Sequence, residues 1–425
     1  MTIATVALLC LFVVAYSLIS RKIEDRAVSG PMIFLVFGLV IGPDGLDAAS
    51  FDIESSVVVV LAELTLAVVL FSDAARLDVP ALRRDPGIPA RLLAIGLPLT
   101  VALGTGMTAL LLTDLSWAEA ALVAAVLTPT DAALGQAVVT DQRVPLRIRQ
   151  SLNVESGLND GLIVPVVLVF VATVEGEELG GVDEFLADAL SEMLIGAGVG
   201  VGLALVAGWL LSTADRNGWV AKDYEQLAML AIGVGAYALS TELDGNGFMA
   251  AFLAGITLSH TMGAEAARRV AFSEDLAQLL ALVMFVVFGA IMVGPALGEL
   301  TVPIAVCALA TLTLGRMLPV WFATIGTGLA PVSRLFLGWF GPRGLASILF
   351  GLLIVEESDI ATKSTLFVII TWVVVASVFA HGVTAAPGAA RYSARLEARD
   401  DTEEMMEMEA PVEAEPRVRW QRRKP

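Results

Sequence analysis

Polar and charged side chains gather in the first half of one apolar segment, residues 148–173. Within a few positions it contains Glu155, Ser156, Asn159 and Asp160. Residues four apart lie on one face of a helix, so Ser156 stands beside Asp160 and Glu155 beside Asn159. A hydroxyl and a carboxylate are hard oxygen ligands that suit a small alkali cation. The spacing therefore predicts that Asp160 and Ser156 bind a monovalent metal cation.

A second apolar segment, 117–138, is interrupted by the run Thr128-Pro129-Thr130-Asp131. Proline removes a backbone donor and clashes with the preceding turn, so the helix should break there. Non-helical backbone at membrane depth is tolerated where it lines a cavity, and its carbonyl oxygens are then free to bind an ion. We expect Thr130 and Asp131 to line such a cavity.

A third segment, 333–355, contains Gly341 and Pro342 directly before Arg343, which predicts a second break. A positive charge at membrane depth requires a partner, and Glu155 or another acid of the first segment would supply it. The two broken segments are the fifth and the twelfth along the chain. This fits two six-helix halves offset by one linker helix, and matching breaks in two halves are typical of inverted-repeat secondary transporters.

The composition indicates that these segments lie in a lipid bilayer. Of the 425 residues, 57% are hydrophobic and only 16% are charged. A soluble chain of this length cannot bury so much apolar surface, whereas a helix that crosses a bilayer needs about 20 apolar residues. We predict an all-α polytopic membrane protein with about 13 transmembrane helices, near residues 2–20, 30–43, 55–73, 91–112, 117–138, 148–173, 189–213, 224–241, 246–260, 274–295, 302–325, 333–355 and 364–386.

Basic residues are concentrated in alternate loops. The loops after the odd-numbered segments contain nearly all the arginines and lysines, and the other loops contain only Lys363. Basic loops stay in the cytoplasm, which predicts an inner-membrane protein with its N-terminus outside and its C-terminus cytoplasmic. Acidic outer loops and an acidic tail account for much of the net charge of −18, so nucleic acid is not an expected partner. Residues 391–425 lack apolar periodicity and should form a disordered cytoplasmic tail.

Ionisable residues inside the bilayer cost several kcal/mol and indicate function. The acids outnumber the bases, which leaves carboxylate capacity for a cation pathway. Arg316 is expected to pair with a carboxylate or a backbone carbonyl for structural reasons. The acids are Glu63, Asp73, Asp131, Glu155 and Asp160, and the bases are Arg316 and Arg343.

Three runs resemble a known family: TPTDAALGQAVV, SLNVESGLNDG and GPRGLASILF. They look like the sodium/proton exchanger branch of the monovalent cation/proton antiporter superfamily, and most closely like its NhaP-type members. The resemblance covers residues 1–390, a transmembrane antiporter domain, and leaves out the tail. It implies a core of ion-transport helices within about 55–173 and part of 274–386, with the remaining helices as scaffold and dimerisation elements of a homodimer.

The resemblance also implies roles for single residues. Asp160 would be the principal carboxylate that binds the cation and the proton, with Ser156 as a hydroxyl ligand. Asp131 and Thr130 would line the same site from the unwound segment. Asp73 matches the acid at the end of the family's third helix.

Further implied roles are structural. Glu155 and Arg343 would form a buried ion pair held by Asn159. Family members with asparagine before the key aspartate, as in Asn159-Asp160, are generally electroneutral, so one proton is expected to exchange for one cation.

Exchange would follow from competition at one carboxylate together with alternating access. A bound cation expels the proton, and a bound proton expels the cation. The expected activity is proton exchange for sodium or lithium, with potassium/proton exchange as the alternative. The function is transport and not enzymatic catalysis, and beyond the transported ions no cofactor is expected.

Two other classes of membrane protein fit less well. An intramembrane protease would use Asp131 and Asp160 as a dyad that shares a proton. The chain contains no Gly-x-Gly-Asp string, and a protease gives no reason for the break at Arg343. A cation channel would need a filter-like run of carbonyl donors, and the sequence shows none.

Overall fold

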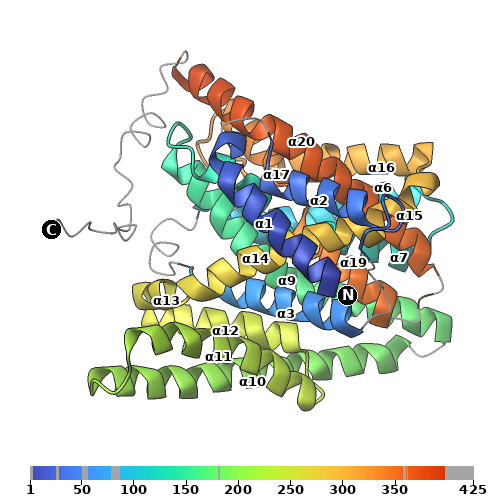
Figure 1. The fold of residues 1–425 in the computed structure, drawn as a ribbon. Helices are drawn as coiled ribbons and strands as arrows, with labels where there is room; N and C mark the ends of the chain where they lie inside the picture. Colours follow the sequence, from blue (N-terminus) through green and yellow to red (C-terminus); the bar gives the residue numbers. More distant parts are fainter. Residues whose placement is uncertain are drawn as a thin grey trace.

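A computed structural model of the chain describes residues 3–24, 28–49, 56–77, 87–179, 182–357, 360 and 362–397. Within these ranges all regular secondary structure is helical (Figure 1). The helices are α1 (Ile3–Glu24), α2 (Gly30–Ile41), α3 (Ser56–Ala75), α5 (Gly87–Arg91), η1 (Leu92–Gly96), α6 (Leu97–Leu111), α7 (Trp117–Val126), α8 (Ala132–Val139), α9 (Leu146–Leu179), α10 (Val182–Arg216), α11 (Lys222–Glu242), α12 (Gly247–Met262), α13 (Ala264–Arg269), α14 (Ala271–Phe288), η2 (Gly289–Val293), α15 (Gly294–Ala296), η3 (Leu297–Glu299), α16 (Val302–Leu312), α17 (Leu314–Ala323), α18 (Pro331–Trp339), α19 (Leu345–Glu357) and α20 (Lys363–Glu397).

The apolar segments predicted from the sequence each coincide with one helix or with helices that follow one another. Within the described ranges, eight helical stretches are long and apolar enough to cross a membrane, and four shorter apolar helices lie among them. The all-helical class is therefore confirmed. The number of crossings and the inverted repeat stay predictions.

Both predicted helix breaks are present. α7 ends at Val126 and α8 begins at Ala132, so the residues between them, Pro129 included, are non-helical. α18 ends at Trp339 and α19 begins at Leu345, on either side of Pro342. Each break replaces one long helix by two short ones that end inside the protein, because proline cannot continue the hydrogen-bond ladder.

The helices are arranged in two groups, each with its own hydrophobic core, and α3 contributes residues to both cores. α10, α11 and α12 lie together along one side, and α3 packs against them through buried residues such as Phe71 and Ala254 (Figure 1). The other helices surround a larger core that includes residues from α2, α9, α14 and α19. α9, which carries four of the predicted site residues, and α19, which follows the second break, are thus covered by other helices on several sides.

The predicted start of the C-terminal tail at residue 391 is wrong. α20 continues to Glu397, and Tyr392 and Leu396 are buried in a core cluster with residues of α9 and α18. The Tyr392 hydroxyl donates to Ser333 Oγ at 2.8 Å, and its ring stacks on Phe336. These contacts hold the last turns of the helix against the protein. Residues 398–425 lie outside the described residues.

α2 crosses η2 at backbone contact. A Cβ atom at Gly289 would overlap the carbonyl oxygen of Leu35, and one at Gly38 would overlap that of Val286. Only glycine permits this approach at both positions. The close approach adjoins the larger core, which contains Leu35 and Val286.

We predict that Gly289→Ala lowers the free energy of unfolding by about 1–3 kcal/mol, because the added methyl group pushes the two backbones apart. Gly202→Ala is the matched control, since nothing lies within 4 Å of a Cβ atom there. The control should lose nothing. Unfolding of purified protein in mixed micelles measures both, and equal effects would refute the close-crossing argument.

Candidate ion-binding site

The two broken helices meet at Asp131. Its backbone N–H donates to the carbonyl oxygen of Pro342 at 2.8 Å, which joins one break to the other. Its carboxylate accepts from the N–H of Leu134 at 3.3 Å and from the N–H of Leu345 at 2.8 Å. These donors open α8 and α19, so one carboxylate caps two helix N-termini, where negative charge is stabilising. A Cβ atom at Gly344 would overlap this carboxylate, which explains the glycine.

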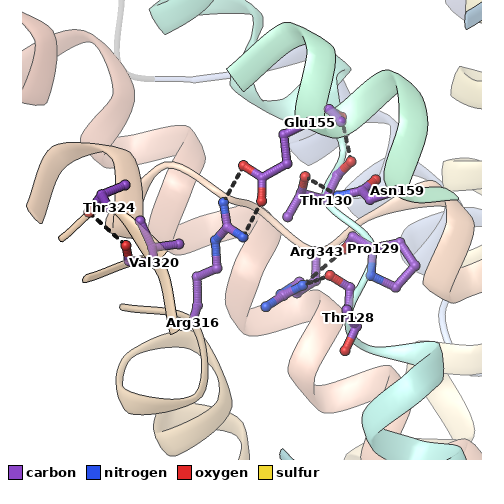
Figure 2. Close-up of polar contacts among 10 residues, drawn as sticks. Thr128, Pro129, Thr130, Glu155, Asn159, Arg316, Val320, Thr324 and Arg343 are labelled. Carbon is purple, nitrogen blue, oxygen red and sulfur yellow. Dashed lines mark hydrogen bonds and ion pairs between the residues drawn. The ribbon is translucent and has the colours of Figure 1, made fainter. Parts of the chain in front are cut away.

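Arg343 lies where the two breaks meet, on the side of the carbonyl groups at the end of α7. Its fully buried guanidinium donates through Nη1 to the carbonyl oxygens of Thr128 and Pro129, just beyond the C-terminal end of α7 (Figure 2). Ser347 Oγ donates to Val126 O at 2.7 Å in the same region. Cations are stabilised at helix C-termini by the exposed carbonyls. The site thus places an arginine at the carbonyl end and an aspartate at the amide ends.

The expected Glu155–Arg343 ion pair is wrong in its partner. Glu155 pairs with Arg316, through Nη1–Oε1 at 2.5 Å and Nη2–Oε2 at 2.6 Å (Figure 2). Both side chains are about 4% exposed. This two-point geometry is the strong form of an arginine–carboxylate contact. Arg343 is held by the carbonyls of the first break instead, and α17 brings Arg316 to α9. The expectation that Arg316 pairs for structure is confirmed.

Two polar residues of α9 form hydrogen bonds with Thr130 in the first break. Ser156 Oγ donates to the Thr130 carbonyl oxygen, and Asn159 Nδ2 donates to Thr130 Oγ1 at 2.7 Å. Asn159 therefore holds the broken segment and not the Glu155 ion pair. A serine hydroxyl that donates once keeps acceptor lone pairs, and Asn159 Oδ1 is buried with no hydrogen-bond partner. The two side chains leave oxygen atoms available beside the break.

Asp160 lies one turn beyond Ser156. It is 7% exposed, and its Oδ1 atom is buried without a hydrogen-bond partner. Asp73 and Asp131 are near enough to act on its charge. Asp73 lies on α3, facing α9: a Cβ atom at Gly157 would be 3.8 Å from Asp73 Cβ. The structure thus brings together the three aspartates that the sequence selected.

Charge balance singles out one of these aspartates. Glu155 is neutralised by Arg316, Asp131 accepts from two helix N-termini, and Asp73 is only partly buried. Burying a carboxylate is costly unless it is paired or protonated. Asp160 is thus the residue whose burial calls for a bound cation or a bound proton.

A contact that sequence reasoning missed fixes the second break to α20. The Arg343 N–H donates to Ser377 Oγ at 2.6 Å. His381 Nδ1 lies 2.9 Å from Ser377 O, and His381 Nε2 lies 2.8 Å from Trp339 O, at the end of α18. His381 was not among the residues that the sequence selected, and its one signal was its position late in an otherwise apolar helix.

The new pairing predicts a specific double-mutant cycle. Arg316→Gln leaves Glu155 buried without its partner and should cost about 3–5 kcal/mol of unfolding free energy. Adding Glu155→Gln should restore part of this loss, because the uncompensated charge is then removed. Unfolding in mixed micelles gives the coupling energy, of the order of 0.5–3 kcal/mol for residues in contact.

The same cycle with Arg343→Gln in place of Arg316→Gln is the control. Its coupling to Glu155→Gln should be smaller, since Arg343 donates to backbone carbonyls. A larger coupling energy at Arg343 than at Arg316 would instead support the Glu155–Arg343 ion pair expected from the sequence.

Comparisons with known proteins agree with this architecture. Residues 7–390 match the family model described as sodium/hydrogen exchanger, transmembrane. The K(+)/H(+) antiporter NhaP of Alkalimonas amylolytica is 26% identical over 83% of this chain and 60% of its own length. The K(+)/H(+) antiporter NhaP2 of Shewanella sp. strain MR-4 is 29% identical over 75% of this chain and 55% of its own length. The chain thus spans a little over half the length of these relatives.

Solved structures show the same fold. The sodium proton antiporter MjNhaP1 of Methanocaldococcus jannaschii at pH 8 superimposes with a TM-score of 0.75. It is 22% identical, and the match covers 92% of this chain and 98% of that one. The broken helices and the apolar spans are therefore those of a multi-pass membrane protein, and the family match extends over nearly all the described residues. The chain belongs to the sodium/hydrogen exchanger family of membrane transporters.

Proposed function

We propose that this protein exchanges protons for a monovalent cation across the membrane, and that Asp160 binds both in turn. The observation that carries the proposal is the burial of Asp160 beside the first break with an oxygen atom that has no partner. Neighbouring oxygens of Ser156 and Asn159 complete a hard ligand set for an alkali cation. Membership of a transporter family supports the same reading.

Coupling follows from the chemistry of one carboxylate. A cation at Asp160 needs the ionised form, and a proton removes the charge that attracts the cation. Only one of the two is therefore bound at a time. If the site opens to each side of the membrane only when occupied, each passage of a cation in one direction requires a proton in the other.

Sodium or lithium is the first candidate cation, because a carboxylate, a hydroxyl and an amide oxygen form a compact set of hard ligands. Potassium is the second candidate, and the names of the curated relatives from Alkalimonas and Shewanella favour it. We propose a 1:1 exchange, since Asn159 beside Asp160 is neutral. The proposal extends to a homodimer in the inner membrane with its N-terminus outside, acting in pH homeostasis.

The protease alternative is weakened by the geometry of Asp131. A catalytic dyad needs two carboxyl groups that share one proton. Here both carboxylate oxygens of Asp131 accept from backbone N–H groups, at Leu134 and Leu345. A carboxylate whose two oxygens are engaged by two helix N-termini serves as a structural cap.

We predict that Asp160→Asn abolishes exchange, since the amide neither binds a proton nor carries the charge that attracts the cation. The measurement is pH-gradient dequenching in proteoliposomes, with sodium, lithium and potassium added in turn. Asp244→Asn makes the same chemical change in an exposed turn and should exchange at the wild-type rate. Wild-type exchange by Asp160→Asn would refute the site.

Loss of folding is separated from loss of function by stability. Asp160→Asn removes a buried charge, so its unfolding free energy should equal or exceed that of the wild type. A variant that fails to exchange but unfolds later than the wild type identifies Asp160 as functional. Early unfolding would point to a structural role instead.

A 1:1 exchange predicts that an imposed membrane potential leaves the final cation gradient unchanged. Each net charge moved across about 100 mV is worth about 2.3 kcal/mol, so an electrogenic exchanger would shift that gradient about 50-fold. Flux of the cation that the dequenching assay selects, measured in vesicles with clamped potential, decides between the two. A shift of that size would exclude electroneutral exchange.

A further inference from the structure

Six arginines lie at one end of the helix bundle and form what we call the arginine patch. They come from four segments that are far apart in the sequence: the end of α5, the loop before α9 with its first turn, the start of α18 and the end of α20. Its members are Arg91, Arg143, Arg147, Arg334, Arg391 and Arg395.

Contacts between these segments bring the arginines together. Val144, Ile148 and Leu396 belong to one buried cluster, which joins the loop before α9 and the first turn of α9 to the last turn of α20. The Tyr392–Ser333 hydrogen bond joins the last turns of α20, which carry Arg391, to the start of α18, which carries Arg334. Further along, Arg334 stacks over Trp321 of α17, and Arg91 donates to the carbonyl oxygens at the end of that same helix. The four segments that carry the arginines therefore meet in one part of the protein.

The patch is left strongly positive. In the described residues 87–91, 140–147, 325–334 and 391–397, six arginines face two acids, Asp141 and Glu397. Asp141 is paired with Arg143 at 2.6 Å, and the Arg143 guanidinium holds the pKa of that carboxyl below its usual range. Arg391 and Arg395 are exposed on the last turns of α20.

The chain that leaves α20 has the opposite charge. Between residues 400 and 415 it carries eight acids and no basic residue. A chain spans at most about 3.3–3.6 Å per residue, so the three steps from Glu397 to Asp400 keep the first acid within about 11 Å of the end of the helix. A segment tethered this closely meets the patch at an effective concentration in the millimolar range.

We propose that the acidic segment 400–415 of this same chain docks on the arginine patch. Complementary charge and a short tether favour this occupant over any that must arrive by diffusion. Docking would cancel the positive field at the end of α9, the helix that carries Asp160. That consequence rests on the proposed function, because a positive field repels a cation substrate. The docking itself does not rest on it.

The test uses the full-length protein in nanodiscs of neutral lipid. Arg391→Lys and Arg395→Lys keep the charge but supply an amine, which a carbodiimide couples directly to a carboxylate in contact with it. Mass spectrometry of the peptides should find links from the substituted positions to residues 400–415. The links should be lost as the Debye length shrinks from about 10 Å at 0.1 M salt to about 3 Å at 1 M.

Arg268→Lys on α13 is the matched control, because its exposed side chain lies 3.7 Å from Glu265. It should link to Glu265 and not to residues 400–415, and its link reports how well the coupling itself works at each salt concentration. Equal linking of the acidic segment to position 268, or no link at positions 391 and 395, would overturn the proposal.

Two further experiments test whether another copy of the chain or the lipid headgroups occupy the arginine patch. A mixture of isotopically labelled and unlabelled chains shows whether links join two copies, and links found only between copies would contradict docking within one chain. Nanodiscs with anionic phosphatidylglycerol test the competing source of negative charge. If the links vanish there while the Glu265 link persists, the headgroups occupy the patch and the acidic segment does not.

Discussion

The structure depends on how four helix ends are satisfied inside the protein. Each break exposes the carbonyls of one half-helix and the N–H groups of another, and a membrane offers no water to bond them. Asp131 accepts from the N-termini of α8 and α19, and Arg343 donates to the carbonyls at the end of α7. The Asp131–Pro342 backbone bond joins the two breaks directly. The place where the two breaks meet thus contains one acid, Asp131, at the N–H ends and one base, Arg343, at the carbonyl end, and their charges balance.

Because Asp131 and Arg343 balance each other where the two breaks meet, Asp160 differs from its neighbours in having a buried carboxylate oxygen without a partner. Glu155 is paired with Arg316, and Asp131 is engaged by backbone N–H groups, so these two acids do not need a bound ion to balance their charge. Thr130 links this scaffold to α9 through Ser156 and Asn159. Occupancy of Asp160 can therefore change without disturbing the ion pairs that hold the helices. The same contacts would carry a displacement of the broken segment to α9.

Local chemistry made part of this arrangement predictable from the sequence. Proline at 129 and at 342 disfavours a continuous helix, and residues 156 and 160 share a face at any helix position. Proline alone does not decide a break, because Pro165, Pro319 and Pro387 lie inside α9, α17 and α20. The partner of Glu155 was not predictable in this way, because two buried arginines were available and only the packing of α17 against α9 selects Arg316. The anchoring of Arg343 by Ser377 likewise joins residues 34 apart in the chain, which no local pattern encodes.

A fully paired site would suit the proposed exchange of a cation for a proton poorly. A salt bridge at Asp160 would lower the cost of burial, and a cation or proton would then have to displace the partner before binding. An aspartate with an unpaired buried oxygen keeps that cost in the empty state and releases it when either ion binds. In the proposed exchange the empty site would thereby be disfavoured, which would suppress passage of an unloaded carrier and couple the two fluxes. The unpaired oxygen of Asp160 would then serve that function, while Asp131, Arg343 and the Glu155–Arg316 pair are held by contacts of their own.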